Sequence, residues 1–255
     1  MAYLSTQPQP PPEQAAFETQ IVTYIPPVPL DHPDPPRILI EETPNLLAAG
    51  SNVGLRTWEA SLRLATYLYS NAELVKHKTI LELGSGTGLV AILCSGVLDA
   101  TYVRVTDGLL HVVDNLEKNI ARNTTSGLLD ADTRLIRAAV LDWADTQGLE
   151  DALLDADEVE HQYDLFLGAD ITYSPDVVPI LAQLLKILLE TYPHAQAIIS
   201  ATIRNERTWA VFCESCQQKG LTMERIVFEC PGMSGQNGFF HEQAFPIVIV
   251  RISKD

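Results

Sequence analysis

Hydrophobic positions along this chain follow two alternating periods, one typical of helices and one of strands. Trp58, Leu62, Ala65 and Tyr69 recur every three or four positions, which indicates a helix with one buried face. Short apolar runs at 79–84, 101–107, 134–139, 163–170 and 195–202 predict strands. Helical patterns separate most of them, at 89–98, around 112–120, at 175–190 and at 207–219. This alternation predicts an α/β fold, a doubly wound and mostly parallel sheet with helices on both faces.

The two ends of the chain depart from this alternation. Apolar runs at 222–229 and 245–252 are separated only by the Gly-rich stretch "CPGMSGQNGFF", so they predict an antiparallel C-terminal hairpin at the sheet edge. Residues 1–36 are rich in Pro and Gln and predict a flexible N-terminal arm, with residues 21–25 able to pair as an edge strand. The folded domain is expected to span residues 37–255.

Acidic side chains outnumber basic ones, 33 to 17, and the net charge is −16. This balance argues against direct binding of nucleic acid and favours a partner with a basic region. Residues 138–185 contain no Lys or Arg, and this segment is either a solvated loop or a surface that steers a basic partner. No apolar run reaches the roughly 18 residues that span a bilayer, and no leader sequence is evident. We therefore expect a cytoplasmic monomer with no membrane contact.

Cys213 and Cys216 form a Cys-x-x-Cys pair, the spacing of half a zinc site or of a redox pair. No second pair of ligands with suitable spacing accompanies it, and both residues fall in the helix expected at 207–219. Ordinary free thiols, and no metal site, are expected.

The stretch "ELGSGTG", residues 82–88, carries the strongest chemical signal. Alternate glycines let a strand turn sharply into a helix while the backbone approaches a ligand closely. A dinucleotide fingerprint would need a glycine at position 89, where the chain has Leu89, and no Gly-Lys-Ser or Gly-Lys-Thr follows for a Walker A loop. What remains is an acid just before the loop, Glu82, and another at the end of the next strand, Asp107.

In a doubly wound sheet, an acid that closes the second strand is placed to accept ribose hydroxyls. Two carboxylates would repel a pyrophosphate and favour a ligand without phosphate and with positive charge. S-adenosyl-L-methionine, with its ammonium, sulfonium and adenosine, meets that description.

The motifs "ELGSGTG" and "ADITY", with "GLRTWEASLRLATYL", "VTDGLLHVVDNLEKNI" and "TIRNERTWAVF", resemble the seven-strand (class I) protein lysine methyltransferases. The similarity extends over residues 52–255 and is greatest to the branch that modifies eukaryotic elongation factor 2. It implies a Rossmann-like, seven-stranded methyltransferase domain that uses S-adenosyl-L-methionine. The Pro-rich N-terminus departs from the usual leading region of that branch.

The resemblance also implies roles for individual residues. Trp58 would lie against the cofactor, Trp143 would border the adenine, and Asp107 would hold the ribose. Alternative roles are core packing for Trp58, a loop anchor for Trp143 and a helix cap for Asp107. The methionine end would be surrounded by Glu82, Gly84, Ser85, Gly86 and Gly88, and the cofactor set is completed by Thr87 and Ala169.

Asp170 ends the apolar run at 163–170, and Tyr173 follows three residues later. A lysine amine, with a reference pKa near ~10.4, must lose a proton before it can accept a methyl group. The hypothesis is that Asp170 orients the amine and Tyr173 shapes its channel, and whether Asp170 also takes the proton stays open. Residues 202–205 follow the next strand and either contact substrate or begin a helix with Asn205 as its cap.

The predicted function is therefore transfer of a methyl group from S-adenosyl-L-methionine to a lysine of a protein, with elongation factor 2 as the implied substrate. Two alternatives remain: a small-molecule methyltransferase with a closed apolar pocket near Asp170, and a docking protein with a secondary enzymatic role.

Overall fold

The structure is a computed structural model of the chain. It describes residues 18–29, 31–44, 53–130, 135–145, 148–153, 161–229, 231, 233–242 and 244–254.

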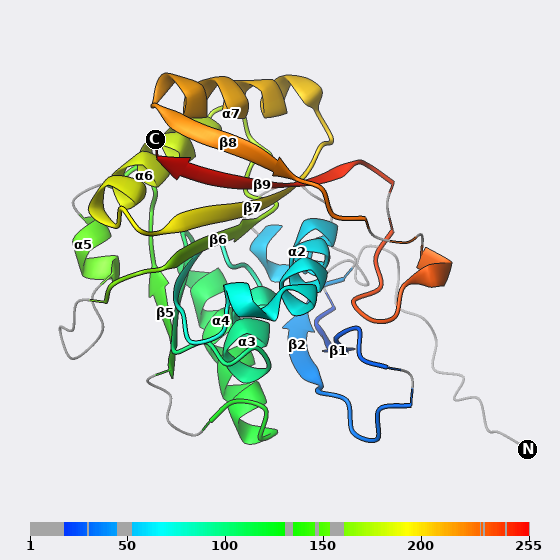
Figure 1. The fold of residues 1–255 in the computed structure, drawn as a ribbon. Coiled ribbons are helices and arrows are strands. Elements are labelled where there is room, and N and C mark those ends of the chain that lie inside the picture. The colour runs from blue at the N-terminus through cyan, green and yellow to red at the C-terminus, as the bar shows by residue number, and fades with distance from the viewer. Residues whose placement is uncertain are drawn as a thin grey trace, which may run out of the picture.

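The centre of the fold is a seven-stranded sheet, which the described residues form in the order β5-β4-β3-β6-β7-β9-β8 (Figure 1). Its strands are β3 (Thr79–Leu83), β4 (Tyr102–Asp107), β5 (Ile136–Val140), β6 (Leu165–Ala169), β7 (Gln196–Thr202), β8 (Leu221–Ile226) and β9 (Ile247–Lys254). Strands β3 to β7 are parallel, while β9 lies antiparallel between β7 and β8. The predicted doubly wound sheet and its antiparallel C-terminal hairpin are confirmed.

Helices cover both faces of this sheet (Figure 1). One face packs against α2 (Glu59–Ser70), α3 (Leu89–Gly96) and α4 (Leu110–Thr125), and the other packs against α5 (Gly148–Leu153), α6 (Val178–Thr191) and α7 (Glu206–Gln218). Along β3, Ile80 belongs to the apolar cluster on the face covered by α2, α3 and α4, whereas Leu81 and Leu83 belong to the cluster on the face covered by α5, α6 and α7. Successive side chains of a strand point to opposite faces, so a strand buried on both sides reads as a continuous apolar run.

The parallel register brings the carboxyl ends of three strands together. Leu83, the last residue of β3, pairs with Thr106 of β4 on one side and Gly168 of β6 on the other. The segments that follow these strands therefore meet at one edge of the sheet, the edge where ligands bind in folds of this kind.

Some element ends differ from the sequence-based expectation. The helix expected at 175–190 begins at Val178, with Pro179 in its first turn, so the prediction that Pro175 opens it is wrong. A proline in the first turn costs no intrahelical hydrogen bond, which makes either proline an acceptable start. The strand expected at 222–229 already ends at Ile226. The order of the elements is unaffected.

A separate two-stranded sheet precedes the main one. Strand β1 (Gln20–Tyr24) pairs antiparallel with β2 (Ile38–Glu42), so the segment expected at 21–25 is indeed a strand, although its partner is β2. The expected arm boundary after residue 36 falls between these two strands. Residues 1–17 of the arm lie outside the described residues.

Three asparagines, one on each successive turn of α4, hold β2 in place. Asn123 accepts a hydrogen bond from Leu39 N at 2.9 Å and donates to Leu39 O at 2.7 Å. Asn119 accepts from Glu41 N at 2.7 Å and donates to Glu41 O at 3.2 Å, and Asn115 donates to the same oxygen at 3.1 Å. These side chains satisfy backbone groups that a neighbouring strand would otherwise pair, and so they fix the hairpin on the main domain.

Candidate active site

The glycine loop joins the end of β3 to the start of α3. Gly84, Gly86 and Gly88 have φ angles of 61°, 54° and 83°, in the left-handed region that favours glycine. Ser85 N donates to Thr106 O at 2.8 Å, and Gly88 N donates to Ser85 O at 2.9 Å. The loop therefore folds back against β4 before it enters α3.

Close neighbours leave little space for a side chain at the glycine positions of this loop. A Cβ atom on Gly84 would lie 2.7 Å from Ile171 and 3.3 Å from the ring of Trp143, and one on Gly86 would lie 3.1 Å from Gly54 O. Trp143 thus lies beside the first glycine of the loop. Its indole Nε1 is buried and has no hydrogen-bond partner among the described residues, which leaves a donor available for a ligand. Its expected contact with the adenine stays a prediction.

Asp107 closes β4 and contacts the same loop. Its carboxylate accepts hydrogen bonds from Gly86 N at 3.2 Å and Leu109 N at 3.3 Å. Burial raises the pKa of Asp107, while bonds from the backbone amides of Gly86, Leu109 and Gly108 oppose that rise. The N-cap position of α4 is Leu109, so Asp107 does not cap that helix. Its role as the ribose acceptor stays a prediction.

Glu82 lies at the end of β3 with only 2% of its surface exposed. Burial raises the pKa of Glu82 to about 8, although hydrogen bonds from the Ser85 side chain and the Ala91 backbone oppose the rise. Its Oε2 atom is buried and unpartnered among the residues that the structure describes. A buried carboxyl oxygen without a partner is costly, and a cationic ligand group such as the ammonium of S-adenosylmethionine would satisfy it.

The free protein should lose stability as the pH rises from about 5 to about 8. The pKa of Glu82 is about 8 in the folded protein and has an ordinary value of 4.5, so the folded state holds the extra proton between these values. Each pH unit in that window then costs up to about 1.4 kcal/mol of unfolding free energy. Denaturant unfolding of the wild type and Glu82→Gln from pH 5 to pH 9 measures this slope. The substitution should flatten it, and an unchanged slope would refute the assignment.

Thr87 connects the glycine loop to the N-terminal hairpin. Its hydroxyl lies 2.7 Å from the Thr57 hydroxyl, and its carbonyl accepts from Asn119 Nδ2 at 3.0 Å. Thr57 N donates to Glu42 Oε2 at 2.8 Å, and the Tyr24 hydroxyl donates to Glu42 Oε1 at 2.8 Å. A buried chain of hydrogen bonds thus runs from β1 through β2 to the loop.

Thr87→Val should weaken binding of S-adenosylmethionine about fivefold, because a lost buried hydrogen bond costs about 1 kcal/mol. Thr87→Ser retains the hydroxyl and should bind like the wild type. Titration calorimetry with the cofactor measures both variants. Equal affinities of the Val and Ser variants would show that the hydroxyl contact does not hold the loop.

Asp170 follows β6 directly and is 8% exposed. Its φ is 59°, and its backbone N donates to Ser200 O at 2.8 Å. Both carboxylate oxygens are bound by the guanidinium of Arg204, with Nη1 to Oδ1 at 3.1 Å and Nη2 to Oδ2 at 2.9 Å. Thr202 N adds a contact to Oδ1 at 3.3 Å. The carboxylate is therefore held at the ends of β6 and β7 by an ion pair that the sequence did not predict.

Arg204 makes further contacts with the start of α2. Its Nη2 lies 3.5 Å from Glu59 Oε2, and its Cζ lies 5.1 Å from the centroid of the Trp58 ring. The Cζ of Arg56 lies 4.5 Å from the same centroid, and Trp58 Nε1 donates to Val53 O at 2.9 Å. Trp58 is thus a half-buried contact surface for two guanidinium groups near Asp170. Its expected contact with the cofactor stays a prediction.

Tyr173 lies in the segment that follows β6, and 60% of it is exposed. Partial burial, followed by the charges of Asp107 and Asp170, raises the pKa of the Tyr173 phenol. Tyr173 follows Asp170 by three residues, so it belongs to the segment at the carboxyl end of β6. Ala169, the last residue of β6, is buried next to Asp170. The roles assigned to Tyr173 and Ala169 stay predictions.

The segment 202–205 performs two tasks. The Oδ1 atom of Asn205 accepts from Arg207 N at 2.9 Å and Thr208 N at 3.4 Å, so the predicted cap of α7 is confirmed. Arg204 turns instead to Asp170. From the sequence alone no charge role is assigned to Arg204, whose one distinguishing feature there is its place as a basic residue two positions after a strand end in a strongly acidic chain.

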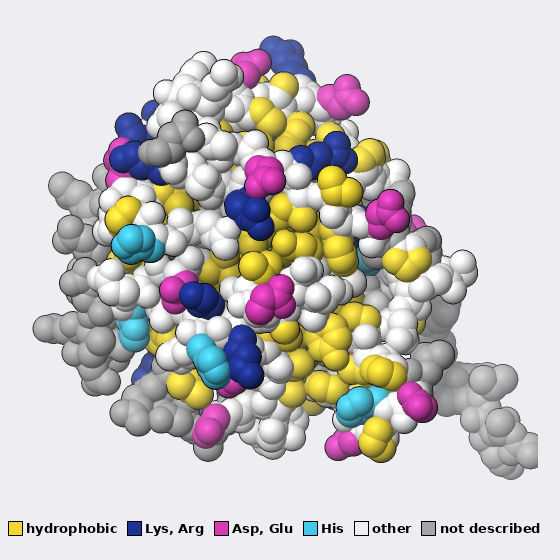
Figure 2. Space-filling model, in the orientation of Figure 1, with side chains coloured by type: hydrophobic (Ala, Val, Ile, Leu, Met, Phe, Trp, Pro, Cys, Tyr) yellow, Lys and Arg dark blue, Asp and Glu magenta, His cyan; other side chains and the backbone are white. Residues whose placement is uncertain are grey.

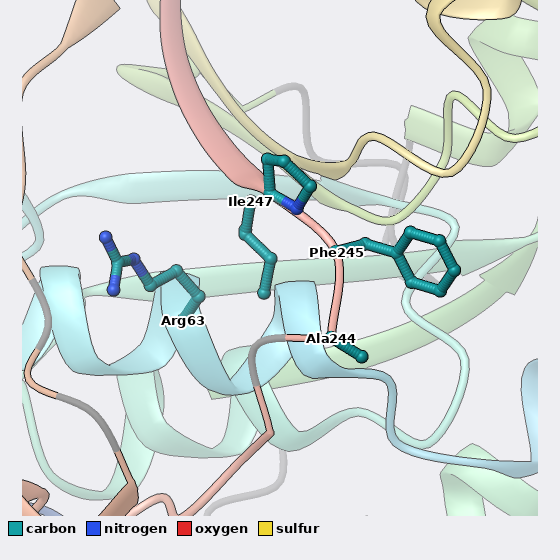
Figure 3. A pocket seen from close by; sticks show the side chains of 5 residues that line it. Arg63, Ala244, Phe245 and Ile247 are labelled. Carbon is teal, nitrogen blue, oxygen red and sulfur yellow. The ribbon is translucent and has the colours of Figure 1, made fainter.

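A hollow of about 200 Å³ adjoins Arg204. Its lining residues are Trp58, Glu59, Thr202, Arg204, Glu242, Ala244, Phe245 and Ile247. A neighbouring hollow of about 360 Å³ reaches Arg63 on α2. The other side chains labelled in Figure 3 are Ala244 and Phe245, from the segment before β9, and Ile247, the first residue of β9. Glu242 is exposed and Phe245 is 48% exposed, so the first hollow opens to solvent.

The acidic segment 138–185 is only partly described, since residues 146–147 and 154–160 lie outside the described ranges. On the face in Figure 2, acidic and basic side chains are interspersed with hydrophobic ones. Steering by this segment stays a prediction.

Cys213 and Cys216 are free thiols on α7. Within the described ranges, no group of three or more His, Cys, Asp or Glu is arranged to hold a metal ion. No helix in that part of the chain is both long and apolar enough to cross a membrane.

Solved structures share this fold. A precorrin-6y C5,15-methyltransferase from Geobacter metallireducens matches with a TM-score of 0.50 and 12% identity, over 76% of this chain and 87% of that chain. At this identity the likeness shows the fold alone.

Sequence comparison identifies the family. The protein-lysine N-methyltransferase EFM3 of Chaetomium thermophilum is 37% identical over 100% of this chain and 74% of its own length. The protein-lysine N-methyltransferase EEF2KMT of Mus musculus is 27% identical over 84% of this chain, which spans 62% of that relative. A lysine methyltransferase family model matches residues 43–219. The chain therefore belongs to the lysine methyltransferase family, with S-adenosylmethionine as its methyl donor.

Proposed function

We propose that this protein transfers a methyl group from S-adenosylmethionine to the side-chain nitrogen of a lysine in elongation factor 2. One observation carries the proposal: Asp170 and Tyr173 lie at the same sheet edge as the glycine loop and Asp107. In this proposal the site for the methyl donor therefore lies next to the site for the lysine nitrogen. The two relatives are both named protein-lysine N-methyltransferases, which supports a protein as the substrate.

The cofactor end of the site rests on three side chains in this proposal. When bound, S-adenosylmethionine supplies a methyl group on a positively charged sulfur. Asp107 accepts the ribose hydroxyls, the unpartnered Glu82 oxygen meets the ammonium group, and Trp143 borders the adenine. The three glycines with positive φ let the backbone approach the ligand.

At the substrate end, Asp170 orients the lysine nitrogen through a hydrogen bond, and the Tyr173 ring packs beside the aliphatic part of the lysine side chain. A carboxylate oxygen accepts more than one hydrogen bond, so Asp170 can contact the amine while Arg204 stays bound. Because both Asp170 oxygens already bind a cation, we assign Asp170 to orientation and assign the departing proton to water.

The open hollow beside Arg204 favours a protein substrate over a small molecule. A small-molecule enzyme should have a closed apolar pocket near Asp170, whereas this hollow is lined by charged Glu59, Arg204 and Glu242. In this proposal the enzyme acts as a monomer in the cytoplasm, on a basic target region that complements the net charge of −16.

Incubation with radiolabelled S-adenosylmethionine and a eukaryotic cytosolic extract tests the proposal, with purified elongation factor 2 and elongation factor 1A in parallel. Label should appear on elongation factor 2 and be lost with Asp170→Ala. Label on elongation factor 1A alone would correct the substrate. Label on a metabolite and on no protein would overturn the proposal.

A further inference from the structure

Arg204 places a fixed cation where a lysine ammonium would arrive. Its guanidinium forms a two-pronged ion pair with Asp170 and a further contact with Glu59 at 3.5 Å. The side chain is 31% exposed, so it is partly shielded from solvent screening. The proposed function uses this charge only to exclude Asp170 as the proton acceptor, and gives it no effect on the substrate amine.

Several elements direct titratable or charged groups at this position, and acids outnumber bases among them. Arg204 shares its hollow with Glu59 and Glu242, and the ring of Trp58 lies beneath it. The described groups around Arg204 and its partners are Asp170 and Tyr173 after β6, Arg56 just before α2, Glu59 and Arg63 on α2, and His241 and Glu242 before β9. The charge of Asp107, at the end of β4, also acts on Tyr173.

We propose that Arg204 is a positioning residue that offsets the Asp170 and Glu59 carboxylates, so that the substrate lysine loses its proton easily at neutral pH. The proposal rests on the proposed function, since it concerns the lysine bound at Asp170. It assigns to Arg204 a part in deprotonation without contact between Arg204 and the reacting atoms.

Simple electrostatics gives the direction in which these charges shift the pKa of the lysine amine. Carboxylates beside a bound ammonium stabilise its charged form and raise the pKa of the amine, which slows formation of the neutral nucleophile. A guanidinium beside those carboxylates cancels much of their effect. The ammonium gives its proton to water, and the nitrogen keeps the electron pair that later forms the new N–C bond. As that bond forms, the bond between the donor's sulfur and the methyl carbon breaks, and the sulfur keeps its electron pair and leaves as a neutral thioether. Removing Arg204 should therefore strengthen ammonium binding and hinder its deprotonation.

Arg204→Gln should raise the midpoint of the pH profile of kcat by about one unit, since a nearby charge shifts a pKa by that order. At pH 7.5 kcat should fall about tenfold, while KM for the protein substrate should not rise. The substrate is purified elongation factor 2, or the protein that the labelling experiment identifies. Initial rates from pH 6.5 to pH 10 at saturating cofactor give the profile.

Three further variants distinguish an effect of the Arg204 charge on the pH profile from an effect of Arg204 on the structure of the site. Arg204→Lys keeps the charge and should return the midpoint most of the way to the wild-type value. Glu59→Gln removes a carboxylate and should shift the midpoint in the opposite direction. Arg207→Gln removes an equal charge from an exposed side chain three residues away, which makes no ion pair with any described residue, and should leave the profile unchanged.

A second measurement does not depend on turnover. Without cofactor, Arg204→Gln should bind the protein substrate at pH 7 at least as tightly as the wild type does. A lower kcat at every pH with an unshifted midpoint, or weaker substrate binding, would assign Arg204 a structural role and overturn the inference. Absence of any protein labelling by the wild type would instead overturn the proposed function.

Discussion

Asp170→Asn should lower kcat for the protein substrate by about 100-fold or more and change the affinity for S-adenosylmethionine by less than about threefold. Asparagine has the same size and tolerates the φ of 59° at this position. It lacks the charge that pairs with Arg204 Nη2 at 2.9 Å and that, in the proposed function, orients the amine. Methyl transfer and cofactor titration, measured on the same preparations, separate the two effects.

The matched control is Asp176→Asn. Asp176 is an exposed acid in the turn after β6, and no ion pair of its side chain occurs within the described part of the chain. This variant should keep wild-type turnover. Full turnover by Asp170→Asn, with normal cofactor binding, would remove Asp170 from the substrate end of the site.

Features set by local sequence were predictable. The order of strands and helices follows from the change between two hydrophobic periods, and Leu81 and Leu83 show why buried parallel strands read as unbroken apolar runs. The sharp turn after β3 follows from Gly84 and Gly86, since few other residues adopt their backbone angles. The position of Asp107 at the second strand end then follows from the parallel register.

Contacts between distant segments were not predictable from one sequence. Arg204 and Asp170 lie 34 positions apart, and they meet because Ala169 of β6 pairs with Ser200 of β7. No local period reports that register. A strand pairing shifted by one residue would send each side chain to the opposite face, so the partner of Asp170 requires the fold itself.

The hairpin shows the same limit at the other end of the chain. Pro-rich composition favoured a flexible arm over residues 1–36, yet β1 within that segment pairs with β2. Strand β2 is in turn bound by Asn119 and Asn123 of α4, 78 and 84 positions away from Glu41 and Leu39. Composition reports how much surface a segment buries by itself. It does not report side chains elsewhere that are placed to pair with its backbone. The glycine loop is thus linked to a hairpin whose first strand lies in the segment where the sequence predicts a flexible arm.

Asp107→Ala should weaken binding of S-adenosylmethionine about 100-fold, because the proposed ribose contact consists of two charge-assisted hydrogen bonds, each worth about 1.5 kcal/mol or more. Part of the loss has a second origin, since Asp107 also accepts from Gly86 N at 3.2 Å and so helps to shape the loop. Titration calorimetry measures the affinity, and thermal unfolding without cofactor measures the structural share.

Two variants apportion these effects. Asp107→Asn keeps an acceptor for the Gly86 and Leu109 amides but loses the charge, so its affinity should fall about tenfold while its unfolding temperature stays near that of the wild type. Asp114→Ala, an exposed acid on α4, should bind normally. If Asp107→Ala loses stability but binds the cofactor as the wild type does, then Asp107 serves the loop alone and the ribose must be held elsewhere.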